Sequence, residues 1–247
     1  MKTEIYTIPI QDAFVEESEC PVCRMYQKLE ENAINYTIGP GASYMEGDIR
    51  EQSDEQGFCQ KHLEMLYEYP NKLGLAMMLK THMDKTAKEL KKAMKAPLPQ
   101  SVGLFRKKSQ TVHPVITFVE EKEKKCFVCD YINHSFTNYI NTIYYLYEKE
   151  EDFRRQFAAS KGFCVNHYKV LFSGAPEYMG KKYLNEFLMT LNETFINGYE
   201  RVRDDLEWFI CKNDYRYKEQ PWKNARDALQ RGLVKAGSIM EAEEKKE

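Results

Sequence analysis

Apolar residues recur along most of this chain at the three- and four-residue spacing that predicts amphipathic α-helices. The longest apolar stripe predicts a helix over Lys181–Phe209, and a second stripe predicts a helix over Lys72–Lys95. Residues 132–147 form a third, broader apolar face. Only Ile5–Ile10 has the character of a strand. We therefore expect a mainly α fold in which these stripes pack into the core.

Six of the seven cysteines belong to a motif that occurs twice. Each copy begins with Cys-x2-Cys. A third cysteine follows after 35 residues in the first copy and after 34 in the second, and it belongs to the sequence Gly-Phe-Cys-x2-His. Seven cysteines placed at random give only about 0.2 Cys-x2-Cys pairs in a chain of this length, so two ordered copies are a specific signal. The eight candidate ligands are Cys20, Cys23, Cys59 and His62 in the first copy, and Cys126, Cys129, Cys164 and His167 in the second.

The spacing of these residues favours metal binding. Two ligands three residues apart, at a turn or a helix start, can point at one ion, and two such pairs complete a tetrahedron. Three thiolates with one imidazole form a Cys3His set, a common structural zinc site that leaves no open position. We predict two zinc ions, each held by the four ligands of its own copy.

Two other interpretations of the cysteines compete with zinc binding. An iron–sulfur cluster is the alternative cofactor, because it also accepts cysteine with occasional histidine and spacing alone does not separate it from zinc. Disulfides fit poorly, because three cysteines leave one thiol unpaired in each copy and the expected compartment is reducing.

The repeat also sets the expected organisation of the chain. We expect two pseudo-repeated helical units, each organised around a Cys3His metal site and packed as one compact body. A proline-rich stretch with little periodicity separates the units and is interpreted as a linker. The predicted boundaries are 1–96 for the first unit, 97–119 for the linker, 120–211 for the second unit, and 212–247 for a C-terminal docking segment and tail.

One stretch breaks the similarity of the two copies. Residues 39–56 carry three glycines and a proline, where the second copy has a continuous helical pattern. We expect a long irregular loop there, and such loops in compact domains are often functional. Tyr44, Asp48 and Arg50 could offer an aromatic ring, a carboxylate and a guanidinium to a partner. A loop that simply folds over the first metal site is the equally weighted alternative.

Charge and hydropathy narrow the functional classes. The 247 residues contain 36 Lys and Arg against 38 Asp and Glu, giving a net charge of −2. This balance disfavours nucleic-acid binding through bulk positive charge. No run of apolar residues is long enough to span a membrane, and the first residues do not have the pattern of a secretory signal. We expect a cytoplasmic protein without a membrane partner; its oligomeric state is not predicted.

The doubled motif is also the basis of a resemblance. CPVC and CFVC, each followed by GFC-x2-H, together with DLEWF and DYRYKEQPWKNARDAL near the C-terminus, resemble uncharacterised prokaryotic proteins that share a domain of unknown function. The resemblance covers nearly the whole chain, and both copies have all four ligand types. It implies a shared fold and supplies no activity.

The remaining sequence contains no familiar catalytic motif, neither a phosphate-binding glycine loop nor a nucleophile elbow nor His-Glu-x-x-His. We therefore favour a non-enzymatic, zinc-stabilised helical interaction or adaptor protein that binds an unknown protein partner. The alternative is a redox- or metal-responsive protein that uses iron–sulfur clusters or labile zinc thiolates. An enzyme is a third class, and it would need a pocket that converges on Tyr44, Asp48 and Arg50.

Overall fold

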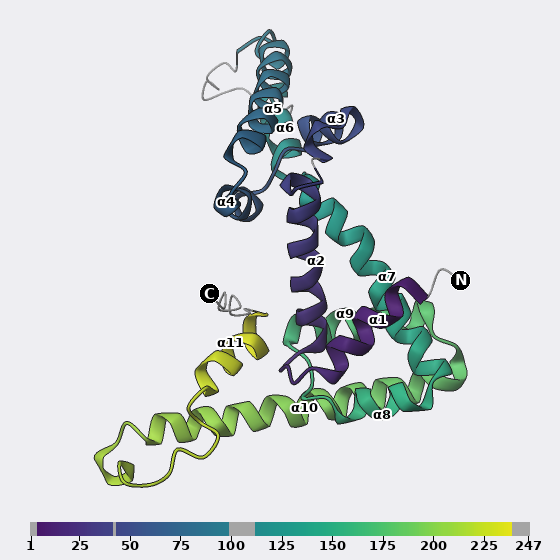
Figure 1. Cartoon of the computed structure of the whole chain (residues 1–247), viewed down its shortest axis with the longest axis vertical. Helices are drawn as coiled ribbons and strands as arrows, with labels where there is room; N and C mark the ends of the chain where they lie inside the picture. Colours follow the sequence, from purple (N-terminus) through teal and green to yellow (C-terminus); the bar gives the residue numbers. More distant parts are fainter. Residues whose placement is uncertain (1–3, 42, 99–111, 239–247) are drawn as a thin grey trace, which may run out of the picture. The chain divides into compact units, whose positions relative to one another are not determined.

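The structure is a computed structural model that describes residues 4–41, 43–98 and 112–238 (Figure 1). Within these residues every regular element is a helix and none is a strand, which confirms the mainly α prediction. The α-helices are α1 (Glu4–Val15), α2 (Pro21–Ile38), α3 (Gly47–Gln56), α4 (Gln60–Glu68), α5 (Lys72–Ala93), α6 (Pro114–Glu123), α7 (Phe127–Lys149), α8 (Glu151–Ala159), α9 (Val165–Tyr178), α10 (Lys181–Cys211) and α11 (Ala228–Gly237). Two short 3₁₀ helices, η1 (Ser43–Met45) and η2 (Tyr215–Tyr217), complete the described elements.

The two longest predicted helices are confirmed. The stripe over Lys72–Lys95 corresponds to α5, and the stripe over Lys181–Phe209 corresponds to α10. The strand character of Ile5–Ile10 is wrong, because these residues lie within α1. A short apolar run does not distinguish strand from helix, and here the buried residues Ile10, Ala13 and Phe14 follow the spacing of one helix face.

The chain forms two compact units that are not consecutive in sequence. The first unit combines Met1–Leu29 with Ser135–Glu247, and the second consists of Glu30–His134. The unit boundaries fall inside α2 and α7. This division does not coincide with the sequential boundaries 1–96, 97–119, 120–211 and 212–247 that the repeat suggests. Within the predicted linker, residues 99–111 lie outside the described residues, and α6 begins at Pro114.

The first unit has an aromatic core. Helix α10 packs against α8, α9 and α11, and α8 also contacts α1 (Figure 1). Around Phe157 of α8, rings from α1, α7, α10 and the segment before α9 meet at centroid distances of 5.0–5.7 Å, namely Phe14, Tyr147, Phe187 and Phe163. The core reaches the cysteines of the motif, because Cys20, Cys23 and Cys164 belong to the same buried cluster.

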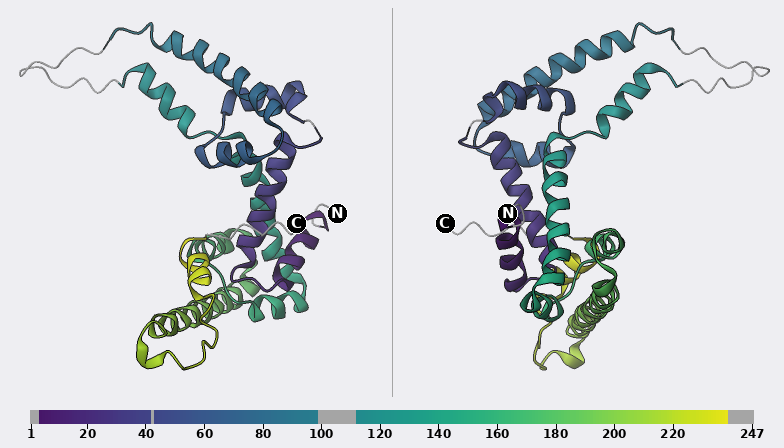
Figure 2. Two further views of the ribbon diagram at one scale, coloured as in Figure 1. Left: turned by 60° about the vertical axis from the view of Figure 1, so that its left-hand side comes forward. Right: turned by 90° about the vertical axis from the view of Figure 1, so that its right-hand side faces the viewer.

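The second unit is built around α5, which contacts α3, α4 and α6. Figure 2 shows α5 and α6 side by side. The irregular loop expected over residues 39–56 is wrong, since η1 and α3 occupy most of it. Ile49 and Ser53, four residues apart, are buried on one face of α3. This packing against α5 outweighs the weak helix propensity of the glycine-rich sequence.

None of the described helices is both long enough and apolar enough to cross a membrane.

Candidate metal centres

The eight predicted ligands gather into two groups of four. Site A consists of Cys20, Cys23, Cys164 and His167, and site B consists of Cys59, His62, Cys126 and Cys129. Within each group all four ligand atoms lie within 4.8 Å of one another. Each site lies within one compact unit, site A in the first and site B in the second.

The predicted pairing of the ligands is therefore wrong. Each site takes its Cys-x2-Cys pair from one copy of the motif and its Cys-x2-His pair from the other. Helix α2 explains the exchange, because it begins at the first Cys-x2-Cys pair and its 18 residues span about 27 Å. The chain has left the first unit before it reaches Cys59, so the two halves of one copy cannot hold the same ion. Helix α7 separates the halves of the second copy in the same way.

The interatomic distances fit a single four-coordinate ion. In site A, His167 Nδ1 lies 3.6, 3.2 and 3.2 Å from the sulfurs of Cys20, Cys23 and Cys164. In site B, His62 Nδ1 lies 3.2, 3.3 and 3.3 Å from the sulfurs of Cys59, Cys126 and Cys129. A zinc ion with ordinary bond lengths in a tetrahedral site places sulfur and nitrogen ligands about 3.5 Å apart.

The sulfur–sulfur distances support the same conclusion. Cys23 and Cys164 are 3.6 Å apart at their sulfurs, and Cys59 and Cys129 are 3.9 Å apart. Two sulfurs on one tetrahedral zinc ion lie about 3.8 Å apart, whereas a disulfide bond is about 2.05 Å long. All seven cysteines are free thiols in the structure, so the disulfide interpretation does not hold.

Helix starts position the ligands of both sites. Cys59 is the N-cap of α4 and Cys164 is the N-cap of α9, so each histidine lies in the first turn of a helix. The two Cys-x2-Cys pairs lie at the starts of α2 and α7. A backbone N–H donates to the sulfur of Cys164 at 3.3 Å and to that of Cys126 at 3.5 Å. Such donors and the positive end of the helix dipole stabilise thiolates.

The backbone conformation and the close neighbours of each Gly-Phe-Cys sequence explain why its first residue is glycine. Gly57 has φ 66° and Gly162 has φ 95°, values that side chains with a Cβ rarely adopt. A Cβ on Gly162 would lie 2.6 Å from the carbonyl oxygen of Thr194. A Cβ on Gly57 would lie 2.6 Å from the ring of His82. Only glycine lets the chain turn into the cysteine at this close approach.

Electrostatics show that the three thiols of one site compete for ionisation. Burial alone would lower the pKa of His62, but hydrogen bonds to Cys126 and Glu30 outweigh it and raise this pKa to about 10. Burial opposes ionisation of Cys126, yet the bond to His62 helps to lower its pKa to about 6. Burial and the neighbouring thiolate of Cys126 raise the pKa of Cys129 to about 12. A cation among the sulfurs would allow all three to ionise.

Site A shows the same competition more strongly. Hydrogen bonds from Cys20 and Cys23 hold the pKa of the Cys164 thiol far below its ordinary value. The bonds to Cys164 and Cys20 raise the pKa of Cys23 far above it. Burial would lower the pKa of His167, but its contacts with Cys164 and Cys20 raise it to about 9. Both donor sets are therefore suited to a dication.

A carboxylate supports the histidine of site B. Nε2 of His62 lies 3.2 Å from Oε1 of Glu30, and Nζ of Lys61 lies 2.5 Å from the same oxygen. Burial would raise the pKa of Glu30, but the bonds to His62 and Lys61 outweigh it and lower this pKa. This arrangement fixes the orientation of the ring and directs Nδ1 toward the sulfurs, as carboxylates do behind many metal-bound histidines.

Helix α11 supports site A. Lys235 is buried, and its Nζ donates to the carbonyl oxygens of Glu19 at 2.7 Å and Lys161 at 2.6 Å. These two residues precede the two halves of the site, so one ammonium group ties both halves together. Burial lowers the pKa of Lys235, and the Glu19 carboxylate, 3.2 Å away, partly compensates. At the end of α11, Oγ of Ser238 lies 3.0 Å from the sulfur of Cys164.

These supporting residues were missed in the sequence. Glu30, Glu19, Lys235 and Ser238 are charged or polar residues in a chain that is rich in them, and no spacing relates them to the motif. The sequence analysis predicts only that residues 212–247 include a docking segment, and it does not indicate where that segment docks.

Tyr44, Asp48 and Arg50 lie on η1 and α3 rather than on a loop. Asp48 is exposed, and the other two are half-buried. Among the described residues no hydrogen bond or ion pair joins any two of them. Their role in binding a partner stays a prediction.

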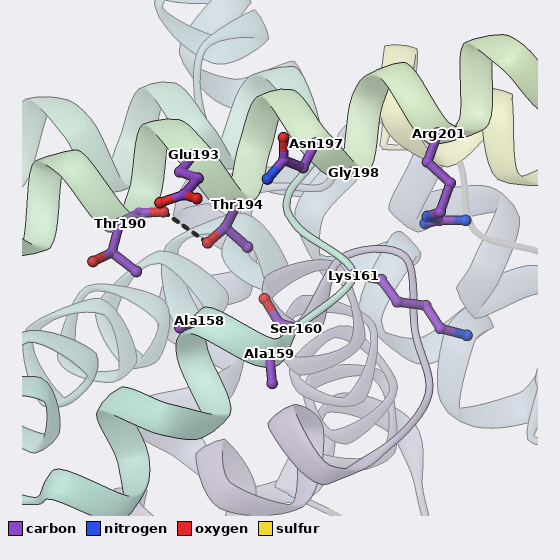
Figure 3. Close-up of a pocket in the computed structure, with 10 residues that line it drawn as sticks. All are labelled: Ala158, Ala159, Ser160, Lys161, Thr190, Glu193, Thr194, Asn197, Gly198 and Arg201. Atoms are coloured by element: carbon purple, nitrogen blue, oxygen red, sulfur yellow. Dashed lines mark hydrogen bonds between the residues drawn. The ribbon is translucent and has the colours of Figure 1, made fainter.

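A polar cavity of about 410 Å³ lies between the end of α8 and α10 in the first unit (Figure 3). Lys161 and Arg201 are the cations that line it, together with Glu193 and several hydroxyl and amide groups. Lys161 is already paired with Glu17 at 3.1 Å, and Arg201 with Glu19 at 2.6 Å. The cavity therefore gives no clear indication of a ligand.

Comparisons with known proteins identify a family. The model of a family described as a family of unknown function, DUF6062, matches residues 1–243. No curated protein and no solved structure matches the chain. The family match covers both candidate metal sites.

Proposed function

The chain belongs to the DUF6062 family of unknown function, and we propose that it is a non-enzymatic helical interaction module stabilised by two zinc ions. The observation that carries this proposal is the closed donor set of each site, three sulfurs and one imidazole nitrogen within 4.8 Å of one another. Four protein ligands fill a tetrahedral zinc ion and leave no position for a substrate, as in structural zinc sites.

The position of the ligands in the sequence supports a structural role. Site A joins residues 20–23 to residues 164–167, and site B joins residues 59–62 to residues 126–129. Zinc adds two positive charges among the thiolates and cross-links chain segments that the unfolded state leaves far apart. Closing such long loops restricts the unfolded chain and stabilises the folded units.

The distances favour one ion over a cluster at each site. An iron–sulfur cluster places several iron and sulfide atoms between its cysteines, whereas the sulfurs of Cys23 and Cys164 are only 3.6 Å apart. Zinc in particular is proposed because thiolate and imidazole ligands in a closed tetrahedral set are its usual donors. The free thiols also fit a reducing cytoplasm, where we place the protein.

Metal analysis of protein purified without oxygen tests this proposal. We expect two zinc ions per chain and a colourless solution. A brown solution with stoichiometric iron and absorption in the visible range would replace zinc with an iron centre. Protein that is fully folded by circular dichroism and holds no metal would refute the structural role.

A second function, a redox response at site B, has one specific observation in its favour. Cys59 and Cys129 are half-exposed, whereas all three cysteines of site A are buried. Hydrogen peroxide could take two electrons from this pair, forming one disulfide and, with two protons, two molecules of water. We expect peroxide to release one zinc ion per chain, measured with a chromogenic chelator, and to link Cys59 to Cys129 by mass spectrometry. Release of both ions together, or of neither, would exclude this function.

A further inference from the structure

Helix α11 of the first unit packs on α9 and α10 while burying little apolar surface (Figure 1). It has ten residues, fewer than an isolated helix needs to be stable in water. Leu229 remains 56% exposed and Leu233 remains 45% exposed. The fully buried residues of α11 are one alanine, Ala228, and one lysine, Lys235. Polar contacts therefore contribute much of what holds this helix in place.

The start of α11 is anchored away from the metal site. A guanidinium nitrogen of Arg231 lies 2.8 Å from a carboxylate oxygen of Asp205 on α10, and both side chains are mostly buried. Arg231 also pairs at 2.9 Å with Asp227, the N-cap of α11. Neither carboxylate is close in sequence to a ligand of site A. This anchor therefore does not require an ion at that site.

The end of α11 is anchored to site A by one ammonium group. Nζ of Lys235 donates to the carbonyl oxygens of Glu19 at 2.7 Å and Lys161 at 2.6 Å, and a carboxylate oxygen of Glu19 lies 3.2 Å from it. Glu19 directly precedes the Cys-x2-Cys pair of site A, and Lys161 lies three residues before the Cys-x2-His pair. The ammonium keeps these partners only while the two halves of the site are held together.

The residue that follows α11 also contacts site A. Oγ of Ser238 lies 3.0 Å from the sulfur of Cys164, and it accepts a hydrogen bond from Nδ2 of Asn166 at 3.1 Å. Asn166 lies between the ligands Cys164 and His167. The end of α11 is thus tied to segments whose positions depend on the ion, unlike the start.

We propose that α11 is a latch that is closed by the metal ion at site A. The inference rests on the proposed zinc at that site. Without the ion, the two pairs of ligands separate, and Lys235 becomes a buried ammonium without partners, which is costly. The end of α11 then detaches and carries this ammonium into water, while Arg231 keeps the start of the helix attached to Asp205.

Opening of the latch uncovers apolar surface. Gly232 of α11 lies close to Leu206 of α10, since a Cβ at this glycine would lie 3.0 Å from a methyl carbon of Leu206. Val234 packs against the buried cluster that includes the cysteines of site A. Both apolar side chains are half-buried while α11 is docked. Loss of the ion therefore changes the surface that the first unit presents, which is a regulatory role beyond stabilisation.

Zinc affinity tests the latch in one direction. An ion that favours docking of α11 must itself be bound more tightly when α11 is docked, and such couplings are usually about 5–150-fold. Lys235→Met keeps the length of the side chain and removes the ammonium, so it should weaken zinc binding at site A at least about fivefold. Gln230→Met, an exposed change on the same helix, is the matched control and should alter neither site. In a competition titration with a chelator, the step that Cys23→Ser lacks belongs to site A.

Hydrogen exchange of the full chain tests the latch in the other direction. Cys23→Ser removes a ligand of site A, so it should speed amide exchange in α11 at least about fivefold and exchange in α8 by less. Cys59→Ser removes a ligand of site B and should leave exchange in α11 unchanged. Equal acceleration in α8 and α11 would overturn the latch, because site A would then support the whole unit.

Zinc content separates this inference from the proposed function. A chain that holds no metal at site A would overturn both. Two zinc ions per chain, with unchanged zinc affinity at site A in Lys235→Met, would overturn the latch and leave the structural role of zinc intact.

Discussion

Site A and site B use the same four ligand types, and each lies at the starts of two helices, α2 and α9 for site A and α4 and α7 for site B, but their surroundings differ. The cysteines of site A are buried in the aromatic core of the first unit, in the same buried cluster as Phe163 and Leu191. Cys59 and Cys129 of site B are half-exposed. In site A the ring of His167 lies beside Tyr26 and Phe136 at 6.4 and 5.7 Å, whereas a carboxylate lies behind His62. The motif thus specifies the donor set, and residues outside it decide how deeply each site is built into the fold.

Loss of one cysteine ligand is expected to give the largest difference between the sites. Cys164→Ser leaves two thiolates and an imidazole without their ion in a buried core, so we expect loss of one zinc and at least about 4 kcal/mol of stability. Cys59→Ser should also lose one zinc, but with a smaller loss of helix, because water reaches the remaining thiols. Circular dichroism, thermal unfolding and metal content measure both effects.

Cys211→Ser is the control for this pair of variants. Cys211 is half-buried at the end of α10 and belongs to neither site. It should retain both zinc ions and the unfolding temperature of the unmodified chain. Equal destabilisation by Cys164→Ser and Cys59→Ser would show that burial does not distinguish the two sites.

This comparison also shows which parts of the molecule can be predicted from sequence. The ligand residues and the starts of α5 and α10 follow from local spacing, so they could be predicted. The assignment of Cys59 to Cys126 rather than to Cys20 could not, because it depends on where α2 and α7 carry the chain. Glu30 and Lys235 approach the sites only after folding, and their positions in the sequence carry no sign of it.

Substitution of the motif glycines compares site A with site B while leaving all eight ligand residues unchanged. A positive φ costs a residue with a Cβ about 1–2 kcal/mol. Gly162→Ala adds a clash with the backbone carbonyl of Thr194, which cannot move alone, so we expect a total loss of about 3 kcal/mol. Gly57→Ala meets only the His82 ring, which can rotate at the loss of its 2.9 Å contact with Asp54, so we expect about 2 kcal/mol.

Denaturant unfolding measures these two losses, and Gly41→Ala is their control. A Cβ on Gly41 meets no atom within 4 Å, so this variant should unfold like the unmodified chain. A larger loss of stability in Gly57→Ala than in Gly162→Ala would show that the clash with the Thr194 carbonyl at site A does not dominate the cost.

The carboxylate behind His62 should affect site B alone. Glu30→Gln keeps the shape of the side chain and removes the charge that orients and polarises the ring, so zinc affinity should fall about 10–100-fold. In a titration of this variant with a competing chelator, zinc should leave site B at a lower chelator concentration than in the unmodified chain. The chelator concentration that removes zinc from site A should not change. Glu68→Gln, an exposed change at the end of α4, should alter neither step. A shift in both steps would mean that Glu30 acts through the whole fold.

The smallest effect is expected at Ser238, whose hydroxyl is the nearest counterpart in site A to that carboxylate. It lies 3.0 Å from the sulfur of Cys164 and 3.1 Å from Nδ2 of Asn166. Loss of one hydrogen bond to a thiolate should speed zinc release from site A by a factor of about 3–10.

Ser238 also has φ 59°, so its hydroxyl and its backbone conformation could both affect site A. Ser238→Ala and Ser238→Gly together separate these two contributions. Both remove the hydroxyl, but only glycine relieves the backbone strain. Equal acceleration in the two variants would assign the effect to the hydroxyl, whereas slower release in Ser238→Gly than in the unmodified chain would assign it to the backbone of α11.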